Sequence, residues 1–320
     1  MNDVCHLLRI RYPIVQGGMG NISNAPLAAA VSEAGGLGTI GCGTMTPDEV
    51  EKLIQQTKER TDQPFAVNIA LRVTPYVEEI IELITKHEVP VVSLSAGNPA
   101  PWIPFLHEHH IRVMAVVASV RHAQKAEKAG ADLIVAEGFE AAGIHSNFEL
   151  TTFTLIPQIT RAVTVPVLAA GGIGDGKGLA AALMLGASGV QLGTRLIATK
   201  EAPFHPQYKK TLLETKDSET LIVGRTVGQT RRILSTPYGH KLASLEKEGI
   251  TVEQYKSLTS EKNHVKGAVK GDLQNGFLNG GQVAGLIDDL PTVQDLFAQM
   301  MSDANEQISR IGNSLQTVGI

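Results

Sequence analysis

The stretch VPVLAAGGIGDGKGLAAALMLGASGVQLGTR, residues 165–195, decides the fold of this chain. It holds two short apolar runs, Val167–Ala170 and Val190–Leu192, with a helical pattern from Gly178 to Leu185 between them. A short apolar run, a helix and a second such run make up one repeat of a parallel sheet. Glycine follows each run at the point where the backbone leaves the sheet.

The same unit recurs through the first two hundred residues. Eight strand candidates are present: Ile14–Gln16, Leu37–Ile40, Phe65–Ile69, Val91–Leu94, Arg112–Val117, Leu133–Ala136, Val167–Ala170 and Val190–Leu192. Seven helical stretches separate them, near residues 25–34, 46–61, 75–87, 102–109, 121–129, 152–163 and 178–185. Eight alternating strands predict an α/β fold, a closed (β/α)8 TIM barrel, rather than an open doubly wound sheet with its usual five or six strands.

The pattern changes after Leu196. A polar helical stretch runs from His205 to about Leu258, a glycine-rich passage from Gly267 to Gly285, and a further helix from Pro291 to about Ile311. We therefore expect a barrel core over residues 1–200, a mainly helical and glycine-rich excursion packed at the barrel mouth over 201–290, and a closing C-terminal helix over 291–320. Five basic residues of the excursion either form ordinary solvated surface or meet an anionic substrate: Lys209, Lys210, Arg225, Arg231 and Arg232.

Composition excludes several classes of protein. The 320 residues are 43% hydrophobic and 19% charged, which is typical of a globular chain. With 28 basic and 32 acidic side chains the net charge is -4, so we expect no nucleic-acid partner. No apolar run is long enough for a membrane span, and the N-terminus lacks a signal peptide's basic region, so we expect a cytoplasmic protein without a membrane partner. Two cysteines, Cys5 and Cys42, predict reduced, inert thiols.

Paired glycines mark the ends of the last two strands. Ala170-Gly171-Gly172-Ile173 follows the seventh and Gln191-Leu192-Gly193-Thr194 the eighth. In barrels of this type the loops after these two strands often bind phosphate through backbone N–H groups, and glycine allows a close approach. The alternative is that these glycines only end strands and start turns. Because two such motifs stand at adjacent strand ends, we favour a phosphate site.

Two further strand ends suggest a ligand at the barrel mouth. The first strand ends in Gln16-Gly17-Gly18-Met19-Gly20, a length of bare backbone on which a flat ligand is able to rest. The third strand carries Asn68 in an otherwise apolar run, and a buried amide needs hydrogen-bond partners. A ligand ring with polar edges would supply them, and so would a neighbouring loop.

Six strings in the sequence resemble those of a known family. The strings that carry the resemblance are Pro13-Ile14-Val15-Gln16-Gly17-Gly18-Met19, Val67-Asn68-Ile69, Ala96-Gly97-Asn98-Pro99, Ala136-Glu137-Gly138-Phe139-Glu140-Ala141, Ala170-Gly171-Gly172-Ile173 and Gln191-Leu192-Gly193-Thr194-Arg195. They are similar to the nitronate monooxygenases, formerly called 2-nitropropane dioxygenases, and equally to the flavin-dependent enoyl-acyl-carrier-protein reductases. Both groups are FMN-binding (β/α)8 barrels, and the likeness extends to the last helix.

The resemblance implies a role for each of these positions. Gly17, Gly18 and Met19 would line the isoalloxazine, and Asn68 and Glu137 would bond its polar edge or the ribityl chain. Ala142 would pass close to the flavin. The FMN phosphate would be held by Gly171, Gly172, Gln191, Leu192, Gly193 and Thr194.

The chain departs from both groups at the suspected catalytic histidine. Their loop after the sixth strand reads Glu-Ala-Gly-Gly-His, whereas this chain reads Glu140-Ala141-Ala142-Gly143-Ile144-His145-Ser146. Ungapped alignment places Ile144 at the histidine position and His145 one residue later. If His145 reaches the flavin, it is suited to abstract a proton from a neutral nitroalkane. If it does not, only substrates that are already anionic, such as nitronates, would be oxidised. The other histidines show no ligand spacing that predicts a metal site.

The resemblance implies an FMN-dependent oxidoreductase that oxidises a small molecule, an alkyl nitronate, with O2 to a carbonyl compound and nitrite. One alternative is a reductase in which NAD(P)H, bound transiently, reduces FMN, which then acts on an enoyl thioester or a quinone; an acyl carrier protein would be its partner. Another is a non-catalytic flavin-binding protein that has lost the base. A homodimer is the default expectation for its assembly.

Overall fold

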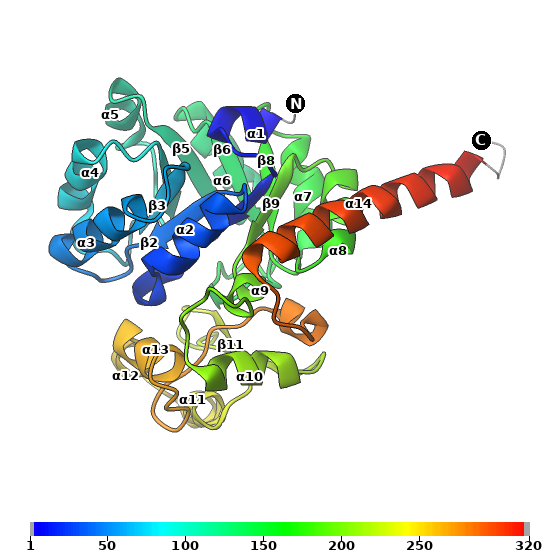
Figure 1. Cartoon of the computed structure of the whole chain (residues 1–320). Coiled ribbons are helices and arrows are strands. Elements are labelled where there is room, and N and C mark those ends of the chain that lie inside the picture. The colour runs from blue at the N-terminus through cyan, green and yellow to red at the C-terminus, as the bar shows by residue number, and fades with distance from the viewer. Residues whose placement is uncertain (1–2, 317–320) are drawn as a thin grey trace.

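The computed structural model of the chain describes residues 3–316, and a closed parallel barrel forms its centre (Figure 1). The eight strands lie in the order β1-β9-β8-β6-β5-β4-β3-β2. The ring closes because Gln16 N–H donates to the Leu37 carbonyl at 2.9 Å and Leu37 N–H donates to that of Ile14 at 3.0 Å. The predicted TIM barrel is confirmed. Its strands are β1 (Ile14–Gln16), β2 (Gly38–Gly41), β3 (Phe65–Ala70), β4 (Val91–Ser95), β5 (Arg112–Val117), β6 (Leu133–Glu137), β8 (Val167–Ala170) and β9 (Gly189–Leu192).

A layer of helices surrounds the barrel, and four of them begin at a residue whose side chain caps the helix. Thr46 and Glu49 form a capping box at the start of α3, and the side chains of Asn24, Ser119 and Asp175 accept backbone N–H bonds at the starts of α2, α6 and α8. The helices are α2 (Ala25–Glu33), α3 (Pro47–Lys58), α4 (Val77–Lys86), α5 (Ile103–Glu108), α6 (Val120–Lys128), α7 (Thr152–Thr160), α8 (Gly176–Met184) and the short α9 (Thr194–Ile197).

The N-terminal end of the barrel is sealed by α1 (Asp3–Leu8), an element that the sequence reading did not include. Val4 and Leu8 of this helix are buried against a cluster that includes Val15, Leu133 and Leu168 from the barrel interior. Ligands therefore reach the barrel from its other end, at the C-terminal edges of the strands.

Both cysteines are buried, and burial raises the pKa of each thiol.

The excursion contains a small antiparallel sheet that the sequence analysis missed. Strands β10 (Thr220–Val223) and β11 (Arg231–Leu234) interrupt the stretch expected to be helical from His205 to about Leu258, so that expectation is wrong in this part. The helices around the sheet are α10 (Pro206–Glu214), α11 (Pro237–Glu248), α12 (Val252–Leu258) and α13 (Glu261–Ala268), and the 3-10 turn η2 (Gln282–Leu286) follows them.

The long loop after β6 ties the excursion to the barrel mouth. Within it β7 (Gly143–Ile144) pairs antiparallel with β11, which places Ile144 opposite Arg231. Arg225 and Glu149 form an ion pair at 2.6 Å across the same junction. The loop from 137 to 151 therefore lies between the barrel and the excursion.

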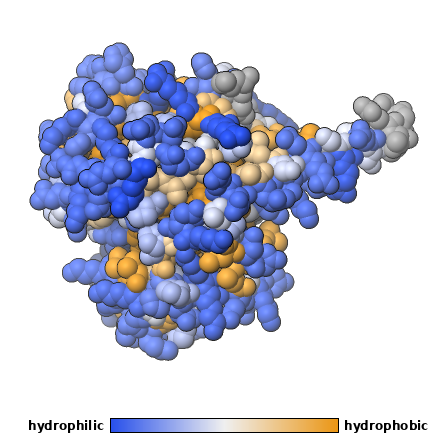
Figure 2. All heavy atoms as spheres, viewed as in Figure 1, coloured by the Kyte–Doolittle hydropathy of each residue, from blue (hydrophilic) through white to orange (hydrophobic). Residues whose placement is uncertain are grey.

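The last helix, α14 (Val293–Gln316), packs along α8 and extends beyond the body of the molecule (Figure 1). Phe297 and Met300, in its first half, are buried, whereas Ile308, Ile311 and Leu315 are exposed on the projecting half. Figure 2 shows polar residues over most of this face, with apolar patches on the excursion. Within residues 3–316, no helix has both the length and the apolar character needed to cross a lipid bilayer.

Candidate active site

One large cavity lies between the C-terminal ends of the barrel strands and the excursion. Its volume is about 1270 Å³. All thirteen residues singled out in the sequence line it: Gly17, Gly18, Met19, Asn68, Glu137, Ala142, His145, Gly171, Gly172, Gln191, Leu192, Gly193 and Thr194. The fold thus brings together residues that are up to 177 positions apart, from Gly17 to Thr194.

The floor of the cavity at β1 is bare backbone packed against Asn68. A Cβ on Gly18 would lie 2.5–2.7 Å from atoms of the Asn68 side chain, so only glycine fits there. The Asn68 amide nitrogen donates to the Ser93 carbonyl and to the hydroxyls of Ser93 and Ser95 at 3.1–3.2 Å. These bonds leave the Oδ1 atom turned towards Gly18. Strand β4 therefore accepts the hydrogen bonds of the Asn68 amide nitrogen, while the amide oxygen lies at the cavity floor and remains able to accept one.

The ends of β8 and β9 offer open backbone to a ligand. Gly171 and Gly172 have φ of +99° and +76°, a conformation that only glycine adopts readily. A Cβ on Gly193 would meet no atom within 4 Å, so there is open space above its backbone. The Thr194 hydroxyl accepts the N–H of Gly281 at 2.9 Å, and its own hydrogen remains able to donate. These two adjacent turns have the geometry expected for holding a phosphate.

A carboxyl group lies at the end of β6 in the cavity wall. Glu137 is largely buried, and burial raises its pKa to about 7. It forms no ion pair among the described residues, so no positive charge offsets the cost of burial. A carboxyl in this state is able to donate a hydrogen bond at neutral pH as well as accept one.

His145 reaches the cavity, but its surroundings disfavour the charged imidazole. Its Nε2 atom lies 2.8 Å from the Ala141 carbonyl oxygen, and its ring packs against Phe139. Burial lowers its pKa to about 4; the bond to Ala141 opposes the shift, and the charges of Arg232 and Arg231 add to it. Ile144, at the position where the resemblance expects a histidine, is exposed. The one-residue shift thus places a neutral histidine in the wall of the cavity.

Sequence reasoning missed the polar residues that the excursion contributes. Arg231, Tyr255, His264 and Asn279 all line the cavity. Arg231 was noted only as one member of a basic group, and the other three were not singled out. The signal available was a charged residue inside the pattern RRIL, residues 231–234, which is otherwise that of a strand.

Four basic side chains lie along the outer wall of the cavity, and we call them the cationic rim: Arg72, His122, Lys125 and Lys128. All four are exposed, and no carboxylate among the described residues lies within 4.0 Å of them. Partial burial, and after it the charges of Lys125, Arg121 and Arg72, lower the pKa of His122 below 6.5, so the positive charge of the rim at neutral pH comes from Arg72, Lys125 and Lys128. The ring of His122 lies 5.7 Å from that of the exposed Phe148.

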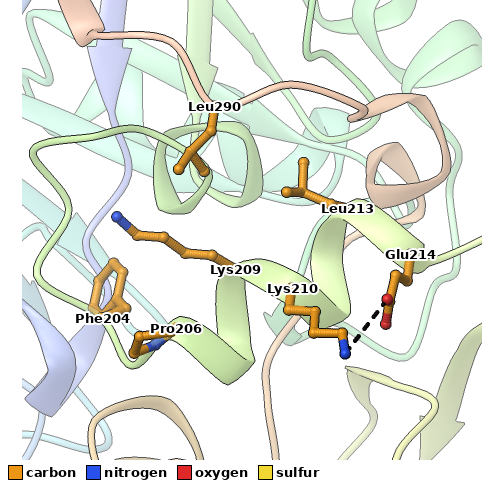
Figure 3. A pocket seen from close by; sticks show the side chains of 7 residues that line it. All are labelled: Phe204, Pro206, Lys209, Lys210, Leu213, Glu214 and Leu290. Carbon is orange, nitrogen blue, oxygen red and sulfur yellow. Dashed lines mark ion pairs between the residues drawn. The ribbon is translucent and has the colours of Figure 1, made fainter.

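The basic residues of the excursion do not share one surface. Lys209 donates to the Thr199 carbonyl at 2.6 Å, and Lys210 lies 3.8 Å from Glu214. Both border a second, smaller hollow on α10, of about 480 Å³, which Figure 3 shows to be lined by Phe204, Pro206, Leu213 and Leu290 as well. Arg232 donates to the Phe139 carbonyl. The five basic residues that were grouped in the sequence analysis therefore lie at separate places in the structure.

Comparison with known proteins places these features in a family context. The family model of nitronate monooxygenase matches residues 2–76 and 72–303. The solved structure of FabK from Thermotoga maritima is 40% identical, with a TM-score of 0.94, over 98% of this chain and 99% of that one. Two curated proteins are each 32% identical over 96% of this chain. One is (3aS,4S,5R,7aS)-5-hydroxy-7a-methyl-1-oxo-octahydro-1H-indene-4-carboxyl-CoA dehydrogenase from Rhodococcus jostii, matched over 96% of its length, and the other is a probable nitronate monooxygenase from Staphylococcus saprophyticus, matched over 98%.

Proposed function

Because the chain belongs to the nitronate monooxygenase family and is an FMN-dependent oxidoreductase, we propose that it is a reductase for an α,β-unsaturated acyl thioester, with NAD(P)H as the electron donor. The observation that carries this proposal is the cationic rim at the outer wall of the cavity. The rim gives positive charge without local counter-charge to a protein whose net charge is -4. Such a surface suits phosphate groups.

The cavity floor supports FMN as the bound cofactor. Gly17, Gly18 and Met19 would lie under the isoalloxazine, and Asn68 and Glu137 would bond its polar edge or the ribityl chain. The turns Gly171–Gly172 and Gln191–Thr194 would hold the phosphate, and Ala142 would lie near the ring. When bound, FMN supplies the two-electron transfer. The observation that favours this fit is the flat glycine floor that a Cβ on Gly18 would disrupt.

The size of the cavity supports a second large ligand. Pockets for one drug-sized ligand are about 300–1,000 Å³, whereas this one is about 1270 Å³. Both NAD(P)H and a thioester on a phosphopantetheine arm carry phosphates at a distance from the reacting carbon, so both match a large site that has exposed basic residues in its lining. A quinone carries no phosphate, and this favours thioesters over quinones.

The overall reaction is balanced by these reactants. NAD(P)H gives up a hydride equivalent and becomes NAD(P)+, the β-carbon of the unsaturated thioester gains a hydride, and its α-carbon gains a proton from water. Similarity to FabK and to a carboxyl-CoA dehydrogenase is consistent with a thioester substrate. The exposed Phe148, next to His122 of the rim, would suit the approach of a carrier such as coenzyme A or an acidic acyl carrier protein.

Nitronate oxidation is the second candidate, and His145 is the observation that favours it. With a pKa of about 4, this histidine is neutral and a weak base near pH 7. A site of this kind would not deprotonate a neutral nitroalkane efficiently, but it would accept a nitronate, which is already an anion.

A charge reversal on the rim tests the first candidate against the second. Purified holoenzyme is mixed anaerobically with NADH, NADPH or an alkyl nitronate while the visible flavin absorbance is followed, and the reduced protein is then mixed with crotonyl-CoA. We expect bleaching by a nicotinamide and recovery of colour with crotonyl-CoA. Lys125→Glu should raise the KM for crotonyl-CoA by about tenfold or more and leave nitronate oxidation unchanged.

The matched control is Lys52→Glu, an exposed lysine on α3 that does not line the cavity. Bleaching by the nitronate alone would replace the first candidate with the second. Absence of turnover with every donor would overturn both candidates.

A further inference from the structure

Arg231 is a buried arginine whose guanidinium has no carboxylate partner in contact. Its exposed fraction is 6%, and among the described residues no carboxylate oxygen lies within 4.0 Å of it. The guanidinium lies over the ring of Phe277 and donates to the Asn279 side-chain oxygen at 3.2 Å. Burial lowers the pKa of the guanidinium, and the side chain of Tyr255, which also interacts with it, opposes this shift. Since a guanidinium has five N–H donors, donors remain for a further acceptor. A buried charge is costly unless it is paired, so this position calls for an anion.

A chain of hydrogen bonds leads from Arg231 to a second donor. Because the Asn279 oxygen accepts from Arg231, its amide nitrogen faces His264, where it lies 3.5 Å from Nδ1. Nε2 of His264 carries a proton both in the neutral tautomer whose Nδ1 accepts from Asn279 and in the imidazolium whose Nδ1 faces Glu261. That Nε2 atom is buried and has no hydrogen-bond partner among the described residues, and His264 as a whole is 2% exposed. The chain therefore ends in an N–H group that lacks an acceptor.

The nearest acid does not fill this role. Glu261 accepts the N–H of Asn21 at 3.1 Å, which turns it towards the loop after β1, and it lies 3.8 Å from His264 Nδ1. Burial opposes its ionisation, but bonding to His264 and the charges of His264 and Arg231 lower its pKa to about 2. Glu261 is thus a fixed negative charge that stabilises the cluster at a distance and makes no ion pair within 4.0 Å of Arg231.

We propose that Arg231 and His264, held by Asn279, bind a planar oxyanion in the wall of the cavity. All three residues line the cavity. The cluster also borders the loop at Gly143, because a Cβ there would lie 3.8 Å from the Asn279 amide nitrogen. The cluster is therefore adjacent to Ala142, which the proposed function places near the flavin.

The oxyanion would be either the enolate formed in thioester reduction or a nitronate substrate. The proposal rests on the proposed function only in that the substrate binds in this cavity. In thioester reduction, addition of hydride to the β-carbon moves the electron pair of the double bond onto the carbonyl oxygen. That oxygen is then an enolate oxyanion until the α-carbon is protonated. In nitronate oxidation, the two oxygens of the nitronate are charged from the start. A guanidinium matches both, since it presents parallel N–H donors.

Binding of small ions to the holoenzyme tests the site without turnover. Nitrate and acetate are titrated against the visible flavin spectrum, with acetamide as the uncharged counterpart of acetate. We expect saturable binding of both anions and binding of acetamide weaker by about tenfold or more. Arg231→Met should weaken nitrate binding by about tenfold or more with an unchanged or higher melting temperature, since an apolar side chain replaces a buried charge. Arg231→Lys should give an intermediate loss.

The same Arg→Lys change at Arg225, which is exposed and pairs with Glu149, is the matched control and should leave nitrate binding unchanged. Failure of nitrate to bind the unaltered holoenzyme would overturn the proposal. So would an Arg231→Met variant that loses stability but retains nitrate affinity, because that result would show a purely structural role.

Kinetics separate the two sources. If the oxyanion is an enolate, its charge is absent from the bound substrate and develops only as hydride adds, so Arg231→Met should lower kcat with crotonyl-CoA by about 100-fold with little change in KM. If it is a nitronate, the KM for the nitronate should rise instead. Should the enzyme reduce no thioester, the proposed function would fail while the nitrate titration would still decide the oxyanion site.

Discussion

The Nε2 atom of His145 lies 2.8 Å from the carbonyl oxygen of Ala141, within the loop that joins β6 to the excursion. A carbonyl oxygen only accepts hydrogen bonds, so Nε2 carries the proton and Nδ1 is the unprotonated nitrogen. Burial and two nearby arginines then hold the pKa of this histidine at about 4. The loop thus fixes both the tautomer and the charge of the residue that the sequence singled out as the candidate base.

The first prediction is that His145 does not titrate in the neutral range. Its imidazole resonances should shift with a midpoint near pH 4, and His145→Gln, which keeps an N–H for the Ala141 carbonyl, should remove only that signal. Turnover of a neutral nitroalkane should be at least about 100-fold slower than that of its nitronate. Histidine NMR titration makes the measurement. A midpoint near 6.5, or a kinetic limb near 6.5 that His145→Gln abolishes, would contradict the assignment.

The second prediction concerns Glu137, whose pKa is raised by burial from 4.5 to about 7. The folded chain binds a proton here at pH values where the unfolded chain has released it, so this group's contribution to stability is present below pH 4.5 and is lost as the pH rises through 7. Between pH 5 and pH 8 the flavin-free chain should lose about 2–3 kcal/mol more unfolding free energy than its Glu137→Gln variant does. Urea unfolding at both pH values gives this difference.

Glu253→Gln on α12 is a suitable control for that comparison, because Glu253 is exposed. Its unfolding free energy should follow the pH in the same way as that of the unaltered chain. Equal pH dependence of the unaltered chain and the Glu137→Gln variant would show that Glu137 is ionised in the folded state.

The third prediction uses the close contact between Gly18 and Asn68. A methyl group on Gly18 would meet the Asn68 side chain at 2.5–2.7 Å, so either the glycine turn or the amide must move. Gly18→Ala should purify with little flavin and should rebind added FMN at least about tenfold more weakly. Gly312→Ala is the control, because a Cβ there meets no atom within 4 Å. Gly312 lies in the last turn of α14 (Val293–Gln316), so that change should leave stability unchanged or raise it by less than about 1 kcal/mol. Normal flavin content in Gly18→Ala would contradict the proposed flavin floor.

The barrel is predictable from the sequence because each of its repeats is local. Val167–Ala170, the helix after it and Val190–Leu192 form one unit within about 25 residues, and the same pattern recurs until eight strands are counted. The strand count also indicates where to look for site residues on the barrel, since the ends of parallel strands meet at one face. Gly18 and Asn68 were found in this way, whereas Glu137 was singled out through the family resemblance.

The structure of the excursion was harder to predict because its sheet includes strands that are far apart in the sequence. Strand β7 is only two residues long, and its partner in β11 lies almost 90 positions later, so no local periodicity marks either strand. Arg231 comes from β11, His264 from α13 and Asn279 from the segment before η2. Their convergence requires the tertiary packing of all three elements. The sequence shows these residues but does not show that they meet.

The last prediction concerns the hydrogen bond that fastens the excursion over the cavity. The Thr194 hydroxyl accepts the N–H of Gly281 at 2.9 Å in a buried position at the end of β9. Thr194→Val keeps the shape and leaves this N–H without a partner, at an expected cost of about 1–3 kcal/mol of unfolding free energy. Thr194→Ser keeps the acceptor and loses one methyl group, so it should cost less than about 1 kcal/mol. Because Gly281 lines the cavity, Thr194→Val should also admit protease to the excursion sooner and should weaken FMN binding. Equal stability of the valine and serine variants would show that the barrel and the excursion are held together by their apolar contacts rather than by this bond.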